Sequence, residues 1–283
     1  MRTATLLMRC RDQRGLVTRI SGFVAEHGGN IVHADHHVDF ESSQFFSRVE
    51  WDIADFTIPA EQIAETFKPI ADELKMEWRL RFSDERPRIA IFASRMDHCL
   101  VDLLHRWSIG ELEGDFVAVI SNHPDLKRAA EHEGVPFHHF PITAQNKRTQ
   151  EQAELELLKT LGVDLIILAR YLQVLTDEFI ATYPSRIINI HHSFLPAFMG
   201  ATPYARAYER GVKLIGATAH YVTPELDQGP IIEQDVTRVS HRDSLQDLIR
   251  KGRDLERVVL ARAVRLELDR RVLAYANKTV VFD

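Results

Sequence analysis

The sequence predicts an α/β protein of two domains. Over roughly the first 83 residues, strand-like and helix-like stretches follow the order βαββαβ, and from Arg88 onward short apolar strands alternate with helical stretches. The first order is typical of two helices on a four-stranded antiparallel sheet, a ferredoxin-like unit. The second is typical of a mostly parallel sheet covered on both faces. The predicted domains are 1–83 and 88–283, joined by the charged, proline-containing linker 84–87.

The first domain is predicted from apolar spacing. Leu16, Ile20 and Phe23 recur at helical intervals after the first strand, and Gly28 ends that helix. Pro69 lies inside the second helix and is expected to kink or shorten it. The predicted strands are 3–10, 31–40, 45–53 and 76–82, and the predicted helices run from the Asp12–Val17 stretch to Gly28 and over 63–74.

The second domain is predicted to be Rossmann-like. Its first strand-to-helix turn reads ASRMDH, residues 93–98, with neither GxGxxG nor GxxxxGK[ST], so no dinucleotide or nucleoside triphosphate site is expected. A short hairpin is expected through Asn277 and Lys278. The predicted strands are 89–93, 116–121, 137–140, 164–169, the apolar run before Asn189, 213–222 and 230–236, and the predicted helices are 97–107, 124–133, 147–161 and 243–270.

The composition is that of an ordinary globular protein. Apolar residues make up 45% and charged residues 27%, and the formal net charge is −6. An acidic balance disfavours nucleic acid and anionic membranes as partners. Cys10 and Cys99 form no CxxC motif, which indicates a reducing compartment. No apolar run is long enough to span a membrane and no signal peptide is apparent, so a cytoplasmic protein is expected.

Two polar stretches follow predicted strands of the second domain. Side chains at positions i and i+2 of an extended chain share a face, so Asn189 and His191 are expected to point together and His192 away from them. The second stretch, 220–235, carries Asp227 in a loop between two strands. An asparagine, a histidine and an aspartate brought together by two loops could surround one carbonyl carbon.

At these two stretches the chain resembles a known superfamily, the folate-dependent formyltransferases. The resemblance extends over most of 88–283, and the stretches 191–204 and 211–236, together with the N-terminal domain, resemble the formyltetrahydrofolate deformylase family over essentially the whole chain. The residues that carry it are Asn189-x-His191-x-Ser193-x-Leu195-Pro196 and His220-x6-Asp227-x-Gly229.

The resemblance implies a hydrolase that acts on a linear amide C–N bond. Its substrate would be 10-formyltetrahydrofolate and its products formate and tetrahydrofolate, a reaction that supplies formate for purine synthesis and balances one-carbon pools without a cofactor. Asn189, His191 and Asp227 would be the catalytic trio. We expect Asn189 and His191 to donate to the formyl oxygen and Asp227 to orient the water and accept its proton. Whether His191 or Asp227 takes the proton first is left open.

The resemblance also implies a folate pocket. Gln173 stands where transformylases have an arginine that contacts the folate carboxylate, so that contact is not expected here. The apolar members of the pocket are equally typical of an ordinary core. The implied substrate-binding residues are Leu168, Tyr171, Leu172, Gln173, Val174, Leu175, Ile180, Val222, Thr223 and Gly229.

Three alternatives stay open beside the hydrolase. A metalloenzyme is disfavoured, since adjacent histidine pairs point to opposite sides of a strand and no HExxH motif occurs, so no metal is expected. A folate or amino-acid sensor would need none of the trio. Formyl transfer to a small acceptor is the main alternative, although the 93–98 loop lacks the Gly-rich phosphate cradle of glycinamide ribonucleotide transformylase.

The N-terminal domain resembles the ACT domains, which are small regulatory modules that often bind amino acids. The motif is Asp12-x-x-Gly15-Leu16 with Asn30 at the start of the second strand. The resemblance implies a regulatory site at these four residues, with glycine or methionine as effector, and a homo-oligomer, either a dimer or a tetramer. The alternative is that this domain serves assembly only.

Overall fold

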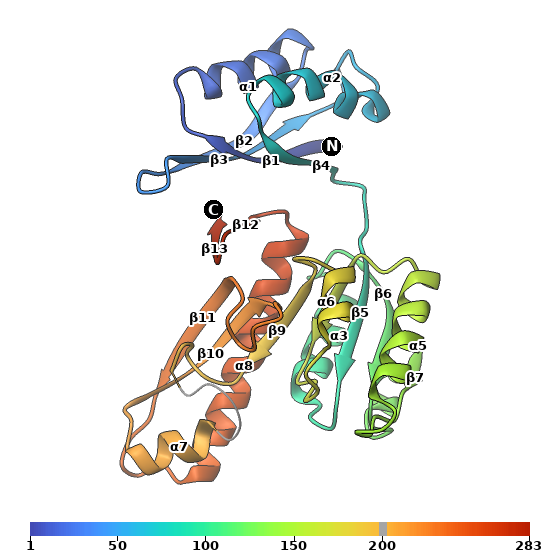
Figure 1. The fold of residues 1–283 in the computed structure, drawn as a ribbon, viewed down its shortest axis with the longest axis vertical. Helices are drawn as coiled ribbons and strands as arrows, with labels where there is room; N and C mark the ends of the chain where they lie inside the picture. The colour runs from blue at the N-terminus through green and yellow to red at the C-terminus, as the bar shows by residue number, and fades with distance from the viewer. Residues whose placement is uncertain (198–202) are drawn as a thin grey trace. The chain divides into compact units, whose positions relative to one another are not determined.

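The computed structural model describes residues 1–197 and 203–283. Part of the 191–204 stretch on which the resemblance rests therefore lies outside the described residues. The chain divides into two compact units, each an α/β structure (Figure 1). The first comprises Met1–Glu85, Arg270–Leu273 and Val280–Asp283, and the second comprises Arg86–Asp269 and Ala274–Thr279.

The end of the chain differs from the predicted division, which placed all of 88–283 in the second domain. Two C-terminal segments belong by their contacts to the first unit. Within that unit the backbone carbonyl of Arg270 accepts a hydrogen bond from Nε of Arg48 at 3.1 Å, and the backbone N–H of Asp283 donates to Asp35 at 3.3 Å. Sequence periodicity reports local structure and carries no information on such distant partners.

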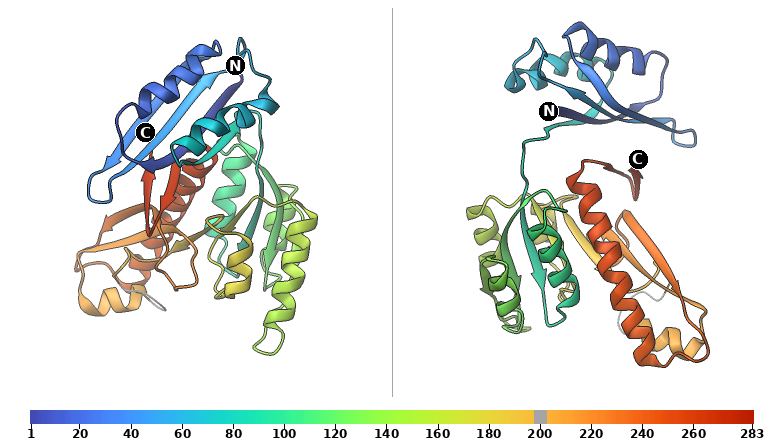
Figure 2. Two further views of the ribbon diagram at one scale, coloured as in Figure 1. Left: turned by 45° about the horizontal axis from the view of Figure 1, so that its top comes forward. Right: turned by 180° about the vertical axis from the view of Figure 1, so that it is seen from behind.

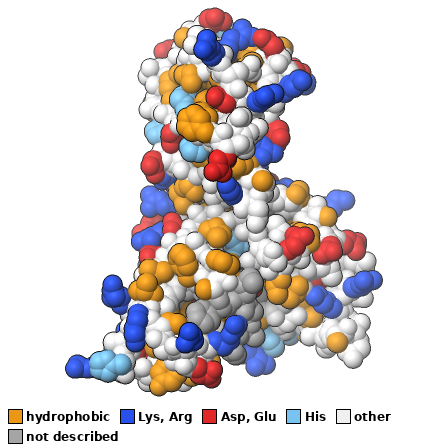
Figure 3. Space-filling model, turned by 60° about the vertical axis from the view of Figure 1, so that its left-hand side comes forward, with side chains coloured by type: hydrophobic (Ala, Val, Ile, Leu, Met, Phe, Trp, Pro, Cys, Tyr) orange, Lys and Arg blue, Asp and Glu red, His pale blue; other side chains and the backbone are white. Residues whose placement is uncertain are grey.

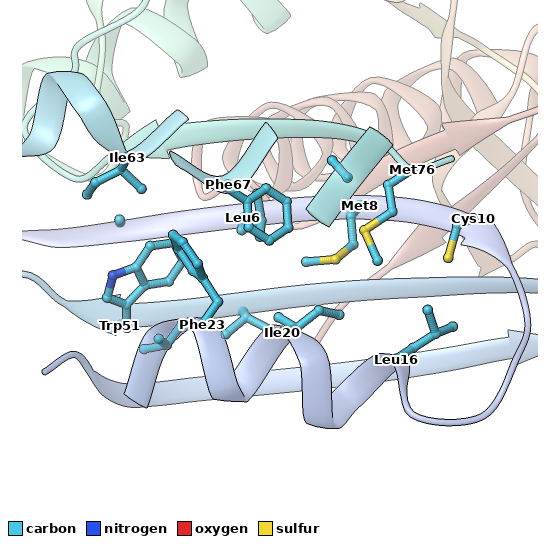
Figure 4. Packing of buried hydrophobic residues seen from close by; sticks show 14 of the residues in the cluster. Leu6, Met8, Cys10, Leu16, Ile20, Phe23, Trp51, Ile63, Phe67 and Met76 are labelled. Atoms are coloured by element: carbon cyan, nitrogen blue, oxygen red, sulfur yellow. The ribbon is translucent and has the colours of Figure 1, made fainter. Parts of the chain in front are cut away.

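The first unit has the predicted ferredoxin-like order. Its four-stranded antiparallel sheet has the strand order β2-β3-β1-β4. One face packs on both helices, and Figure 4 shows the core formed by Trp51, Phe67, Met8 and their neighbours. The elements are β1 Thr3–Arg11, α1 Leu16–Glu26, β2 Asn30–Asp39, β3 Gln44–Asp52, α2 Ala60–Glu73 and β4 Glu77–Phe82.

Pro69 was expected to kink or shorten α2, but the helix is not shortened. The helix runs through it to Glu73, and the N–H of Leu74 still bonds to the carbonyl of Ile70 at 3.1 Å. A proline removes one backbone hydrogen bond. The burial of Phe67 and Ala71 on either side holds the last turn in place, because packing stabilises a helix more than propensity does.

The second unit is built on a seven-stranded sheet with the order β11-β10-β9-β8-β5-β6-β7. Strands β5 to β9 pair in parallel, as predicted, while β10 and β11 are antiparallel additions at one edge. Figure 2 shows helices on both faces of this sheet. The elements are β5 Arg88–Ala93, α3 His98–Ser108, β6 Asp115–Ser121, α4 Lys127–His132, β7 Phe137–His139, α5 Lys147–Thr160, β8 Leu165–Leu168, α6 Asp177–Thr182, β9 Ile187–His191, α7 Pro203–Arg210, β10 Leu214–Tyr221, β11 Ile231–Arg238 and α8 Leu245–Leu268.

The short helices α6 and α7, of six and eight residues, were not predicted from the sequence. The C-terminal hairpin is confirmed as β12 Val272–Tyr275 and β13 Lys278–Val281. None of the helices in the described part of the chain is long and apolar enough to cross a bilayer. Acidic and basic side chains are interspersed on the face drawn in Figure 3.

The topology of this sheet sets the place of the site. The chain leaves β5 toward β6 and β7 on one side and later returns to β8 and β9 on the other side. In open α/β sheets, ligands bind at the carboxyl ends of the strands where the order reverses in this way. His191 ends β9, and the Tyr171–Thr176 segment follows β8, so these predicted site residues lie at that edge.

Candidate active site

Asn189 is held in place by a histidine on the neighbouring strand. It lies opposite His220 in the antiparallel pairing of β9 and β10, and its Nδ2 is 3.2 Å from Nε2 of His220. The other ring nitrogen of His220, Nδ1, donates to the carbonyl of Tyr221 at 2.9 Å. Burial lowers the pKa of His220, so the ring is neutral and its Nε2 accepts from Asn189. One amide N–H of Asn189 is thereby fixed, and the orientation of the second follows.

His191 and Asp227 form the second pair of the site. Nδ1 of His191 lies 3.2 Å from Oδ1 of Asp227, and both side chains are more than nine-tenths buried. The ring nitrogen on the far side, Nε2, is buried without a partner among the described residues. A carboxylate on Nδ1 fixes the tautomer and directs Nε2 at whatever enters the site, the logic of a histidine–aspartate pair.

The loop between β10 and β11 delivers Asp227 through an unusual backbone. Asp227 has φ of 58°, a left-handed conformation that aspartate adopts more readily than most residues. Two residues later, a Cβ on Gly229 would lie 1.8 Å from the carbonyl oxygen of Tyr221, so only glycine fits there. The same carbonyl accepts from His220. Gly229, which the resemblance places in the folate pocket, lets the loop close against β10.

The loop after β9 is fixed by polar groups of β10 and β11. Thr218, fully buried, donates to the carbonyl of Ser193 at 2.8 Å and accepts from the N–H of Leu195 at 3.0 Å. Gln234 donates to the same hydroxyl at 2.9 Å and to the carbonyl of Leu195 at 3.1 Å. The backbone groups at Ser193 and Leu195 are therefore paired where the chain leaves the strand through polar residues.

Comparisons with known proteins show which family has this sequence and fold. Family models match over residues 87–264 for formyl transferases and over 4–72 for the ACT domain. The formyltetrahydrofolate deformylase of Synechocystis sp. is 58% identical over 280 residues, which cover 99% of this chain and 98% of that protein. The chain belongs to the formyltetrahydrofolate deformylase family.

Solved structures show how far the family likeness extends. A formyltetrahydrofolate deformylase from Pseudomonas syringae pv. tomato superposes with a TM-score of 0.98 at 48% identity, covering 100% of this chain and 95% of that one. A glycinamide ribonucleotide transformylase from Symbiobacterium toebii gives a TM-score of 0.67 at 31% identity and covers 72% of this chain. The transformylase thus shares only part of the architecture, and the deformylases share all of it.

The residues assigned to the folate pocket of this deformylase-family chain fall into three groups by exposure. Leu172 and Val174 are 61% and 58% exposed. Gln173, Val222 and Thr223 are half-buried. The others are buried, and four of them, Leu168, Tyr171, Leu175 and Ile180, belong to the apolar core beside the sheet.

Nothing in the sequence indicated that the hydroxyl of Ser94 holds the segment after β8. Oγ of Ser94, at the end of β5, donates to Oδ1 of Asn122 at 2.7 Å and accepts from the N–H of Leu172 at 3.1 Å. Ser94 stands in the 93–98 loop, which lacks a phosphate cradle. In this deformylase-family chain that loop instead ties the segment carrying Leu172 to β5.

His192 packs beside His191. Its ring centroid lies 5.2 Å from that of His191 and 5.7 Å from that of Tyr204. Burial, followed by the charge of Arg170, lowers the pKa of His192 to about 3, so the ring is neutral. That its side chain points away from Asn189 and His191 stays a prediction.

A buried carboxylate also lies in this region and was not predicted. Glu256 of α8 is 1% exposed and is bound by Nε2 of His98 at 2.8 Å, the hydroxyl of Tyr204 at 2.5 Å and Arg170 at 3.4 Å. Burial alone would raise the pKa of Glu256, but His98 and Arg170 lower it below its usual value. The helical spacing does indicate that Glu256 is buried, because it lies on the same helix face as the buried Val259 and Gly252.

The same region holds a group that could geometrically bind a metal ion. Ligand atoms of His98, Cys99 and Glu256 lie within 4.8 Å of one another. The guanidinium of Arg170 already neutralises Glu256, and burial raises the pKa of Cys99 well above its usual value, so that the sulfur is a thiol. A second cation is therefore disfavoured there. That the reaction needs no metal stays a prediction.

The four residues of the predicted regulatory site do not come together within one chain. Arg11 pairs with Gln44, and Asn30 pairs with Asp52, at opposite ends of β3. Eight strand residues separate those ends by roughly 26 Å, so Asn30 is remote from Asp12. The physical reason is the βαβ crossover, which returns the chain to the end of the sheet where β1 began. Gly15 and Leu16 do start α1, with Gly15 in a left-handed conformation of φ 87°.

Proposed function

We propose that this chain hydrolyses 10-formyltetrahydrofolate to formate and tetrahydrofolate. The observation that carries the proposal is the convergence of Asn189 and the His191–Asp227 pair at the carboxyl edge of the sheet. The whole-length likeness to deformylases of stated name, from Synechocystis and from Pseudomonas, supports the substrate.

The reaction begins with attack of water on the formyl carbon. As the O–C bond forms, the carbonyl oxygen gains negative charge, and two donors are available to it: the oriented amide of Asn189 and Nε2 of His191 when protonated. A buried, preorganised donor of this kind is worth about 10²–10³ in rate. The negative charge of Asp227 offsets the positive charge on the ring while it donates.

The proton lost by the water moves to Asp227 and then to the leaving nitrogen as the C–N bond breaks. Water plus a formamide thus becomes formic acid plus a secondary amine, with no atom left over. Asp227 and His191 are in contact, so the ring of His191 lies within reach of the proton that Asp227 accepts. General acid–base catalysis of this kind contributes about 10²–10⁴.

Water is the proposed acceptor for two reasons. The 93–98 loop carries Ser94 bonded to Asn122 and Leu172 rather than a glycine-rich cradle for a ribonucleotide phosphate. The transformylase match covers only 72% of the chain, whereas the deformylases cover it all. Formyl transfer to a small acceptor is the alternative that the test below separates.

A supply of formate for purine synthesis and a balance of one-carbon pools are the proposed physiological roles. The ACT domain supports an amino-acid effector, for which glycine and methionine are the proposed candidates. A homo-oligomer and a cytoplasmic location stay predictions.

The test is incubation of the pure, chelator-treated protein with 10-formyltetrahydrofolate in the absence of any acceptor. We expect formate and tetrahydrofolate in equal amounts, near-normal turnover for Glu225→Gln and loss of turnover for Asp227→Asn. Glu225 is the matched control because it is an exposed carboxylate of the same loop. Consumption of the substrate only after addition of an amine acceptor would favour the transferase.

A further inference from the structure

Helix α5 buries two carboxyl groups on the face that it turns to the protein. Glu151 and Glu154 are 3% and 0% exposed, on the same helix face as the fully buried Leu158. A position of this kind normally carries an apolar side chain, and a buried carboxyl group is costly unless it has partners. Two buried carboxyl groups on this face therefore indicate a specific role for these glutamates.

Apart from Lys147 of their own helix, the partners of the two glutamates lie on one segment, Tyr171–Thr176. Oε2 of Glu151 accepts from the hydroxyl of Thr176 at 2.6 Å, and its Oε1 from the N–H of Thr176 at 3.3 Å. The hydroxyl of Tyr171 donates to Glu154 at 3.4 Å. Nζ of Lys147, which also pairs with Glu151, donates to the carbonyl of Val174. Helix α5 therefore holds the segment at its start, its middle and its end.

This segment has no helix or strand of its own, so side chains must fix its shape. The hydroxyl oxygen of Ser94, which follows β5, accepts a hydrogen bond from the N–H of Leu172. Leu172 and Val174 are largely exposed on a backbone that is otherwise anchored at the switch point of the sheet. An exposed apolar wall on a preorganised backbone suits the binding of a flat heterocycle, because little conformational entropy is lost on binding.

Glu154 differs from Glu151 in having almost no polar environment. Its Oε2 is buried without a partner among the described residues. The titratable groups placed against it are Glu151 on its own helix, with Lys147 beyond, and Tyr171. Burial and then the charge of Glu151 raise the pKa of Glu154 to about 8, and burial also raises that of Tyr171. At neutral pH Glu154 is therefore a neutral acid.

We propose that Glu151 and Glu154 are positioning residues for folate binding, and that Glu154 must be protonated to hold Tyr171–Thr176 in its binding shape. The inference rests on the proposed function, since it takes this segment as a wall of the folate pocket. Loss of the Glu154 proton would place a second negative charge beside Glu151 with one oxygen unpartnered. The segment moves away to admit water, and the substrate binds less tightly.

The test is the pH dependence of KM and kcat between pH 6.5 and 9 for the wild type, Glu154→Gln and Glu156→Gln. Glutamine imitates the neutral acid at every pH, and Glu156 is an exposed control on the same helix. We expect the wild-type and control KM to rise about tenfold by pH 9, since about a tenth of the protein stays competent, and the KM of Glu154→Gln to stay flat. An equal rise in Glu154→Gln would overturn the proposal.

A second pair of variants tests the proposal if the Glu154→Gln protein does not fold. Thr176→Val removes the hydroxyl that donates to Glu151, and Thr176→Ser retains it. We expect a raised KM for the valine variant with little change in kcat, and a normal KM for serine. Equal KM values for both would contradict the role of Glu151.

The same variants are compared by tetrahydrofolate binding, followed by intrinsic fluorescence. If the wild type releases no formate, the proposed function fails, and the binding curves still decide the role of the two glutamates. Formate release with identical binding profiles in wild type and Glu154→Gln overturns only this inference.

Discussion

Oδ1 of Asp227 lies 3.2 Å from Nδ1 of His191, with both side chains nearly inaccessible to solvent. One comes from the end of a parallel strand and the other from a loop between two antiparallel strands. The contact gives one buried nitrogen, Nε2 of His191, a defined direction. The catalytic proposal depends on this contact more than on either residue alone.

Removal of any member of the trio is expected to slow turnover strongly. Asn189→Ala, His191→Ala and Asp227→Asn should each lower kcat by at least about 10², because each removes a preorganised donor or the proton acceptor. Steady-state formate release measures the effect, with circular dichroism as the check on folding. A His191→Ala protein with near-normal kcat would refute the assignment.

His220 is expected to act through Asn189. His220→Phe removes the acceptor for the Asn189 amide, so kcat should fall while KM changes little, because the amide loses its fixed orientation. His105→Phe, a change at an exposed position of helix α3, is the control. A change in KM alone would indicate that His220 affects substrate binding and not the donor geometry.

Stability should fall in acid because of His192. Its pKa is lowered to about 3 in the folded protein, so between about pH 6.5 and 3 the unfolded chain binds a proton that the folded chain does not. Its stabilising contribution is complete above about pH 6.5 and is lost as the pH falls. Urea unfolding measures the free energy of unfolding at pH 5 and at pH 7, and the difference between the two should be smaller in His192→Asn than in the wild type. If that difference is the same in His192→Asn, His192 is not its cause.

Gly252→Ala should destabilise the protein by about 1–3 kcal/mol, the usual cost of overpacking. A Cβ there would lie 2.1 Å from the hydroxyl oxygen of Tyr204, which bonds to Glu256. Gly22→Ala in α1 is the matched control, since its Cβ meets nothing closer than 3.9 Å, and it should stabilise by about 0.5–1 kcal/mol. Thermal unfolding compares the two; a Gly252→Ala protein as stable as the wild type would mean that Tyr204 is free to move.

We expect glycine or methionine bound to the first unit to change activity by changing the affinity of the active site for its substrate. That change in affinity should be about 5–150-fold at most. Because Asp12 and Asn30 lie at opposite ends of β3, a site within one chain predicts that Asp12→Ala abolishes the response and Asn30→Ala does not. Loss of the response in both variants would instead indicate a site shared between two copies. Titration of activity and of binding with each amino acid measures this.

The fold was predictable from the sequence wherever apolar spacing was regular. The strands of both units, the long helices and the C-terminal hairpin follow from it. The short helices α6 and α7 do not, since their identity depends on tertiary packing. The continuation of α2 past Pro69 likewise depends on the burial of Phe67 and Ala71.

The candidate site was predictable where strand parity or the family motif applied. Parity placed Asn189 and His191 together, and the motif supplied Asp227. Their supporting contacts were not predictable: His220 is a motif residue whose bond to Asn189 no spacing shows, and Thr218 is a buried polar residue of β10 that holds the loop after β9. Such a residue shows no partner in the sequence, because the partner comes from a distant segment of the chain.

The most direct test of the central claim is one turnover in water enriched with ¹⁸O. If the His191–Asp227 pair activates water against the formyl carbon, the formate should carry one ¹⁸O atom and appear in equal amount with tetrahydrofolate, and Asp227→Asn should abolish both. Formate without the label, or a formylated acceptor in place of free formate, would contradict the account.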